Sequence, residues 1–238
     1  MSVGIVLVSH SIQLAQATVE LIGQIQSDKP ATVAIAAGSA DGGFGTDAMA
    51  IMNAIEEVQS GNGVVVLTDL GSAILSADMA LEFLGYPDDV VMVGAPFVEG
   101  ALAATITASN GGALADVAQQ ARTALDAKRR HIDGEPASEI GVAPQQPSAD
   151  TSFHQLRVVN AAGLHARPAA RVAHLASQYD AEITVIYQGE HAAATSAMAL
   201  AGLGTQAGDL IELQASGRQA SEALVALTAL IESGFGED

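Results

Sequence analysis

The first 130 residues alternate short apolar runs with longer helical patterns, and this alternation limits the folds open to the chain. The apolar runs with the length of strands are residues 3–8, 32–36, 63–68 and 90–93. Helical patterns occupy residues 12–26, 46–59 and 73–84, with further helices to about residue 129. A repeated order of strand, helix and strand builds a parallel sheet with helices on both faces. We therefore predict an α/β domain over residues 1–130.

Composition excludes several classes of protein. The chain has 238 residues, of which 49% are hydrophobic and 15% charged, so we expect two ordinary globular domains. It contains no cysteine, which excludes disulfides and thiolate metal sites. The apolar start is too short for a signal peptide or a membrane span. Its net charge of −18, without a basic patch, argues against nucleic acid and anionic membrane as partners. A cytoplasmic protein fits these features.

Reactive side chains follow two of the predicted strands. Ligands bind at the carboxyl ends of the strands in parallel sheets. His10 follows the first strand and Asp69 the third, so a carboxylate is placed to fix the tautomer of the imidazole and stabilise its charged form. The alternative is that both residues only cap helices, but their positions at neighbouring strand ends favour a reactive pair. Residues 37–45 form a glycine-rich loop that lacks the motif for nucleotide phosphates.

The second half contains a histidine at the expected start of a helix. His165, Arg167 and Pro168 lie within the run Asn160-Ala161-Ala162-Gly163-Leu164-His165-Ala166-Arg167-Pro168. Backbone N–H groups in the first turn of a helix lack intrahelical partners and bind anions, and proline suits that turn. A phosphoryl group on His165 would meet these groups and one guanidinium. A histidine that only capped the helix would give Arg167 no role, so we predict a phosphorylated nucleophile.

This motif resembles HPr, the histidine phosphocarrier of the bacterial phosphotransferase system. The likeness covers roughly residues 153–235. It includes a strand-like run at residues 182–187, a short helix at 195–200 and an alternating run at 208–213. A closing helix has an apolar face made of Ala223, Leu224, Leu227, Leu230 and Ile231. It implies an α+β open-faced sandwich over residues 153–238, with His165 phosphorylated by enzyme I and Arg167 as its electrostatic partner. Ser196 falls where some HPr proteins carry a regulatory phosphoserine, but we favour a helix cap there.

The first domain resembles the enzyme IIA domains of the mannose family, and more closely the IIA domain of the dihydroxyacetone kinase phosphotransfer subunit. The residues that carry this likeness are Val8-Ser9-His10-Ser11, Gly45-Thr46-Asp47 and Thr68-Asp69-Leu70-Gly71-Ser72-Ala73. Sugar-transport members usually have Gly-His-Gly and Gly-Gly-Ser-Pro at the two strand ends, so this chain departs toward the kinase subunit. The resemblance implies that His10 is phosphorylated, that Asp69 and Ser72 support it, and that the domain forms a homodimer.

A linker is predicted over residues 131–152. It contains Pro136, Pro144 and Pro147 and four acids, but no Lys or Arg. Low hydrophobicity with proline is typical of flexible segments, which would let the HPr-like domain sample its neighbour at high effective concentration.

Together the two resemblances imply a phosphohistidine relay, a phosphoenolpyruvate–glycerone phosphotransferase subunit. Enzyme I, charged by phosphoenolpyruvate, would load His165, which would load His10. His10 would then phosphorylate ADP held by a separate subunit of dihydroxyacetone kinase. This chain would bind no metal and no nucleotide, and because it ends at Asp238, enzyme I would be another protein. The alternatives are an IIA–HPr component of a sugar-transporting system, which would phosphorylate a IIB domain, and a regulatory sensor whose binding depends on its phosphorylation.

Overall fold

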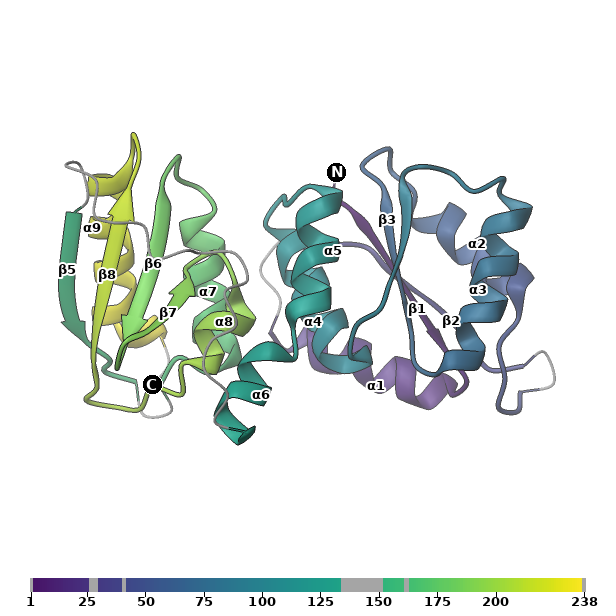
Figure 1. Cartoon of the computed structure of the whole chain (residues 1–238), viewed down its shortest axis with the longest axis horizontal. Helices are drawn as coiled ribbons and strands as arrows, with labels where there is room; N and C mark the ends of the chain where they lie inside the picture. Colours follow the sequence, from purple (N-terminus) through teal and green to yellow (C-terminus); the bar gives the residue numbers. More distant parts are fainter. Residues whose placement is uncertain (1, 26–29, 40–41, 134–151, 161–162, 237–238) are drawn as a thin grey trace. The chain divides into compact units, whose positions relative to one another are not determined.

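The computed structural model describes residues 2–25, 30–39, 42–133, 152–160 and 163–236. The chain forms two compact units, Met1–Leu125 and Asp126–Asp238. Each unit has its own sheet and its own helices (Figure 1).

The first unit is built on a parallel sheet of four strands in the order β2-β1-β3-β4. The strands are β1 (Gly4–Ser9), β2 (Val33–Ala37), β3 (Val64–Thr68) and β4 (Val90–Val93). The helices are α1 (Ile12–Gly23), α2 (Ala48–Val58), α3 (Gly71–Phe83), α4 (Phe97–Ser109) and α5 (Leu114–Thr123). One face of the sheet is covered by α2 and α3, and the other by α1, α4 and α5 (Figure 1). This confirms the predicted parallel sheet with helices on both faces.

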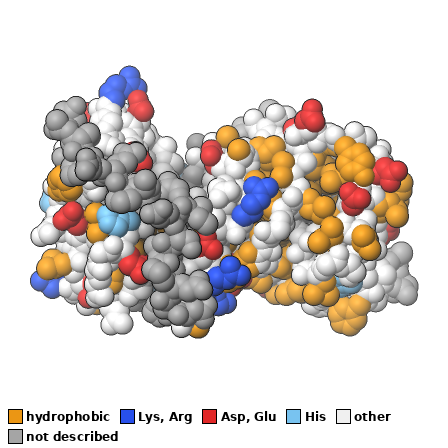
Figure 2. Space-filling model, in the orientation of Figure 1, with side chains coloured by type: hydrophobic (Ala, Val, Ile, Leu, Met, Phe, Trp, Pro, Cys, Tyr) orange, Lys and Arg blue, Asp and Glu red, His pale blue; other side chains and the backbone are white. Residues whose placement is uncertain are grey.

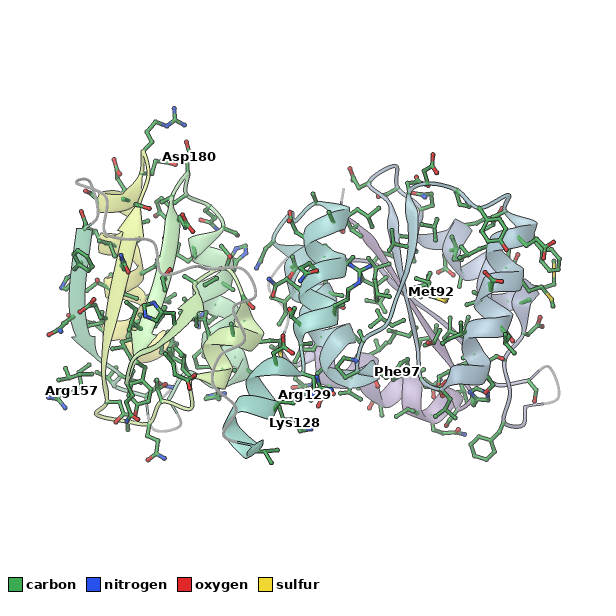
Figure 3. All side chains as sticks on the ribbon, in the orientation of Figure 1. Met92, Phe97, Lys128, Arg129, Arg157 and Asp180 are labelled. Carbon is green, nitrogen blue, oxygen red and sulfur yellow. The ribbon has the colours of Figure 1, made fainter. Side chains whose placement is uncertain are left out.

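Burial on both faces explains why the strands read as continuous apolar runs. All six residues of β1 are buried, as are the first four of β3. On one side they pack against the buried face of α2, which repeats at helical spacing through Ile51, Ala54, Ile55 and Val58. Met92 of β4 packs against the same core (Figure 3). The sheet register pairs Val8 with Thr68, which places the ends of β1 and β3 side by side.

The second unit has an antiparallel sheet of four strands in the order β5-β8-β6-β7. The strands are β5 (Ser152–Arg157), β6 (Glu182–Tyr187), β7 (Glu190–Ala193) and β8 (Leu210–Ser216). The helices are α6 (Asp126–Asp133), α7 (Ala166–Ala176), α8 (Ala197–Gly202) and α9 (Ala220–Glu232), followed by a 3₁₀ turn at Gly234–Gly236. α9 packs on β5 and β8 and also contacts α7 (Figure 1). The predicted α+β sandwich is confirmed.

Alternating burial in β8 shows how the sandwich is held together. Ile211, Leu213 and Ala215 are buried, whereas the residues between them are partly exposed. At the end of the neighbouring strand β5, the guanidinium of Arg157 donates to the carbonyl of Gly208 and fixes the loop before β8 (Figure 3).

Two features of the second unit were not predicted from sequence. β7 pairs with β6 through a two-residue turn, Gln188 and Gly189, whose φ angles are +50° and +84°. Positive φ at both positions is the type I′ geometry that suits the twist of a hairpin. The second feature is the end of α7 at Ala176, where Ser177 is the C-cap residue.

The division between the units falls after Leu125, whereas the sequence placed the end of the first domain at residue 130. α6 belongs to the second unit through its contacts with α8, and it includes the first three residues assigned to the linker. Residues 134–151 of the predicted linker lie outside the described residues. The linker therefore stays a prediction.

No helix in the described part of the chain is long and apolar enough to cross a membrane. Among the same residues, no group of three or more His, Asp or Glu side chains could hold a metal ion.

Candidate functional site

The first candidate site lies at the carboxyl ends of β1 and β3. His10 Nδ1 is 2.9 Å from Asp69 Oδ1, and the backbone N–H of His10 donates to Asp69 Oδ2 at 2.8 Å. On the other side of the ring, Ser72 Oγ is 2.9 Å from His10 Nε2. The side chain of Asp69 is 7% exposed and that of His10 is 24% exposed. The structure thus brings together His10, Asp69 and Ser72, three residues that were singled out from sequence.

Hydrogen bonds keep Asp69 ionised. Burial raises the pKa of Asp69, but hydrogen bonds from the backbone and ring of His10, from Ser9 and from the backbone of Leu70 outweigh this effect and hold the pKa below its usual value. An ionised carboxylate can only accept hydrogen bonds, so Nδ1 of His10 must carry the ring proton. In the neutral ring Nε2 is then the unprotonated nitrogen, and it accepts a hydrogen bond from the Ser72 hydroxyl at 2.9 Å. The ring atom that keeps its lone pair in this arrangement is therefore Nε2.

Ser9 was noted beside His10 in the sequence, but its role in the site was not predicted. It is fully buried, and its hydroxyl donates to Asp69 Oδ2 at 2.9 Å and accepts from the backbone N–H of Ser11 at 3.1 Å. A hydroxyl at the end of an otherwise apolar strand was the available signal, because a buried polar group needs a partner. Ser9 fixes the carboxylate oxygen that the ring of His10 does not use.

The glycine-rich loop after β2 supports the backbone of this site. Gly45 donates its N–H to the carbonyl of His10 at 3.0 Å, and Gly38 donates to the carbonyl of Ser9 at 3.1 Å. Thr46 Oγ1 is 2.7 Å from Ser76 Oγ, which connects the loop to α3. The loop therefore contributes to positioning His10 through its backbone.

We expect Asp69→Asn to slow phosphorylation of His10 by at least about tenfold, because an amide can select the wrong tautomer and cannot offset a positive ring. Quench-flow measurement of label on His10 would test this.

The pKa of Asp69 is lower in the folded chain than its ordinary 3.8, so its ionised form stabilises the fold above that pH. This contribution is lost as the pH falls through the lowered folded value. The difference in free energy of unfolding between wild type and variant should therefore shrink in acid. Equal loading rates for wild type and variant would mean that Asp69 only binds the backbone N–H groups of His10 and Leu70.

The second candidate site is the start of α7. His165 is the N-cap residue, and the first intrahelical bond runs from the N–H of Ala169 to the carbonyl of His165 at 2.9 Å. Ala166 and Arg167 lie in the first turn, where a helix offers no intrahelical acceptor for backbone N–H groups. Pro168 lies in the same turn, as predicted, and the side chains of His165 and Arg167 are both exposed. The arrangement suits an exposed anion beside an imidazole.

Contacts across the fold hold the loop that presents His165. Gly163 has φ of +68°, and a Cβ atom there would lie 1.7 Å from the carbonyl oxygen of Thr205. The backbone N–H of Leu164 donates to Thr205 Oγ1 at 2.9 Å, and Asn160 Nδ2 donates to the carbonyl of Gly163 at 2.6 Å. Sequence reasoning did not identify Asn160 or Thr205 as supports. The signal for Asn160 was its place in the motif, whereas nothing in the local sequence pointed to Thr205.

Ser196 is the N-cap residue of α8. Its hydroxyl accepts from the backbone N–H of Ala199 at 3.3 Å, and its side chain is buried. The structure therefore shows the cap that the sequence favoured. A regulatory phosphate on Ser196 stays a prediction.

Two family models match the two halves of the chain. Residues 4–118 match EIIA-man, described as the phosphotransferase system fructose IIA component. Residues 154–233 match the HPr component phosphorylation site of the same system.

Named relatives agree with this division. The chain is 39% identical over 242 residues to the PEP-dependent dihydroxyacetone kinase phosphoryl donor subunit DhaM of Escherichia coli K12, covering 99% of this chain and 51% of that protein. It thus spans about half the length of the curated relatives that it matches from end to end. The DhaM subunit of a second such kinase, from Listeria innocua, is 35% identical over 106 residues, 44% of this chain and 84% of that protein.

A phosphocarrier protein is a further relative of part of the chain. The phosphocarrier protein NPr of E. coli K12 is 42% identical over 84 residues, 35% of this chain and 93% of that protein. The matches to the Listeria innocua subunit and to NPr thus each extend over most of that relative. The chain therefore belongs to the DhaM family of phosphoryl donor subunits, with an EIIA domain of the mannose family followed by an HPr domain.

Proposed function

We propose that this chain is a phosphohistidine relay that receives a phosphoryl group from enzyme I on His165, passes it to His10 and delivers it to ADP on a dihydroxyacetone kinase subunit. One observation carries the proposal: His10 is held between Asp69 and Ser72 with Nε2 as its nucleophilic atom. Neither a metal nor a nucleotide on this chain is needed for such a transfer.

Transfer between the histidines exchanges one P–N bond for another. The lone pair on Nε2 of His10 attacks phosphorus as the P–N bond to His165 breaks, and the bonding electrons return to the ring of His165. The phosphorylated ring of His10 keeps its proton on Nδ1 and gains positive charge, which the Asp69 carboxylate at 2.9 Å offsets. Ser72 can then donate its hydroxyl hydrogen to a phosphoryl oxygen. These roles account for the contacts of the His10 ring with Asp69 and with Ser72.

A carrier site has to bind a phosphoryl group without trapping it. At His165 the group would meet the start of α7 and the side chain of Arg167. Each helix-end contact of an exposed anion contributes about 0.3–1 kcal/mol. Such weak stabilisation suits a group that is to be passed on.

The acceptor is proposed from the family. The relatives are named as phosphoryl donor subunits of a PEP-dependent dihydroxyacetone kinase, and residues 9–11 follow the kinase-type pattern. In the onward step a terminal oxygen of ADP attacks phosphorus, the bond to Nε2 breaks and His10 returns to a neutral ring. Enzyme I and the ADP-binding kinase subunit are the protein partners, the first unit pairs as a homodimer, and the relay works in the cytoplasm.

Incubation with enzyme I, labelled phosphoenolpyruvate and an ADP-loaded kinase subunit tests the proposal. We expect labelled ATP from the wild-type chain and none from His10→Ala, measured by thin-layer chromatography. A parallel reaction with a purified IIB domain serves as the comparison. Label that reached IIB but not ADP would favour a sugar-transport component, and label that stayed on His10 with both acceptors present would favour a regulatory sensor.

A further inference from the structure

The side of α3 that faces away from the sheet carries several exposed apolar side chains beside the acids Asp78 and Glu82. Small residues with Leu81 face the core: Ala73, Ala77 and Ala80. On the outer side, Leu75 is 73% exposed, Met79 50% and Phe83 53%. Ser72, Leu75, Met79 and Phe83 follow one another at spacings of three and four residues, which places them on one stripe of the helix. A stripe of large exposed apolar side chains on one helix is typical of a surface that another molecule covers.

This stripe begins at the first candidate site, because the Ser72 hydroxyl contacts Nε2 of His10. Two further exposed apolar side chains are adjacent to the site in the chain. Leu70, 59% exposed, follows Asp69, and Phe44, 83% exposed, precedes the glycine whose N–H donates to the carbonyl of His10. We call Phe44, Leu70, Leu75 and Met79 the apolar collar. Hydrophobic side chains gather over α3 in the first unit (Figure 2).

The charges around the collar are all negative. Every charged residue in segments 42–58 and 69–89 is Asp or Glu, including Asp78 and Glu82 of α3. Arg122 lies in α5, which covers the other face of the sheet. A second copy of this chain would offer the same acidic rim, and like charges brought together oppose association. The rim instead complements a different protein whose apolar patch is surrounded by Lys and Arg.

The donor and the acceptor of His10 differ in how much contact they need. The donor histidine belongs to the same chain, so it meets His10 at an effective concentration that can reach the millimolar range. A separate protein must offset the loss of its translational and rotational freedom, which requires buried contact area. We propose that the apolar collar is the docking surface for the protein that accepts the phosphoryl group from His10, an ADP-binding protein with an apolar face rimmed by basic residues. This inference rests on the proposed function.

The double variant Leu75→Gln with Met79→Gln tests the collar. Both side chains are at least half exposed, so the substitutions should leave the fold intact. We expect the KM for the ADP-loaded kinase subunit to rise about tenfold, which corresponds to about 1.4 kcal/mol of lost binding. The kcat at saturating acceptor and the loading of His10 should stay unchanged. Val225→Gln, on α9 of the second unit and 70% exposed, is the matched control and should behave as wild type.

Charge reversal provides a second measurement. Asp78→Lys with Glu82→Lys should also raise the KM for the acceptor, and it should weaken the dependence of that KM on salt concentration. Sedimentation velocity on all variants would show whether the oligomeric state changes.

The possible failures are distinguishable. If the wild-type chain makes no labelled ATP, the proposed function fails. If the wild type makes ATP and the Leu75 and Met79 variant has the same KM, only the docking inference fails. Loss of His10 loading would mean that the collar serves the donor, and a changed oligomeric state would mean that it joins copies of this chain. Either result overturns the inference.

Discussion

A His165→Ala chain should acquire no phosphoryl group from enzyme I on either histidine, whereas a His10→Ala chain should still be loaded on His165. The relay predicts this asymmetry because His165 is upstream of His10. Nε2 of His10 can attack only a phosphoryl group that His165 brings to it. Acid-labile label and mass spectrometry of peptides containing each histidine would measure both sites. We expect the label on His10 to fall at least about a hundredfold in His165→Ala.

The control for this experiment adds phosphorylated NPr or HPr to the His165→Ala chain, so that a separate protein can load His10. If this treatment labels His10 in the His165→Ala chain, the site itself is intact and the missing step is the first transfer. Label on His10 directly from enzyme I in the absence of His165 would reverse or bypass the proposed order.

Gly163→Ala should destabilise the second unit strongly and abolish loading of His165. Gly163 has φ of +68°, and the new Cβ would lie 1.7 Å from the carbonyl oxygen of Thr205 and 2.5 Å from its carbonyl carbon. Both neighbours are backbone atoms, so relief requires movement of the loop that presents His165. We expect a loss of roughly 3 kcal/mol or more in the free energy of unfolding of this unit. Urea titration with separate probes in each unit would show the first unit unchanged.

Gly189→Ala is the matched control for this substitution. Gly189 has φ of +84°, but a Cβ there would meet nothing within 4 Å. It therefore reports the cost of the backbone conformation alone, about 1 kcal/mol. Equal losses for the two variants would show that the contact with Thr205 does not restrain the loop.

The parts of the fold that could be predicted from sequence are those in which burial repeats along the chain. β1 and β3 are buried on both faces and read as unbroken apolar runs, while β8 alternates because one face of its sheet packs on helices. β7 was missed because a strand of four residues at the edge of a sheet has little apolar pattern of its own. Its signal was the turn at Gln188 and Gly189.

The same distinction applies to the sites. His10 and Asp69 could be brought together from sequence, because strand order in a parallel sheet determines which strand ends are neighbours. The contact of Leu164 with Thr205 joins residues 41 positions apart through one hydroxyl, which no periodic pattern encodes. The role of Ser9 likewise depends on the direction of a side chain at the end of a buried strand.

The hydrogen bond between Asp69 and Nδ1 of His10 determines which ring nitrogen can be phosphorylated. With one ring nitrogen occupied by the carboxylate at 2.9 Å, a phosphoryl group can form only the Nε2 isomer of phosphohistidine. The ring is also held at both ends and cannot rotate freely about its bond to Cβ. The attacking atom of any acceptor must then lie opposite Nε2, which is the leaving atom. The side chain of Asp69 thus determines the direction from which the acceptor approaches. Antibodies specific for each isomer would distinguish the two products directly.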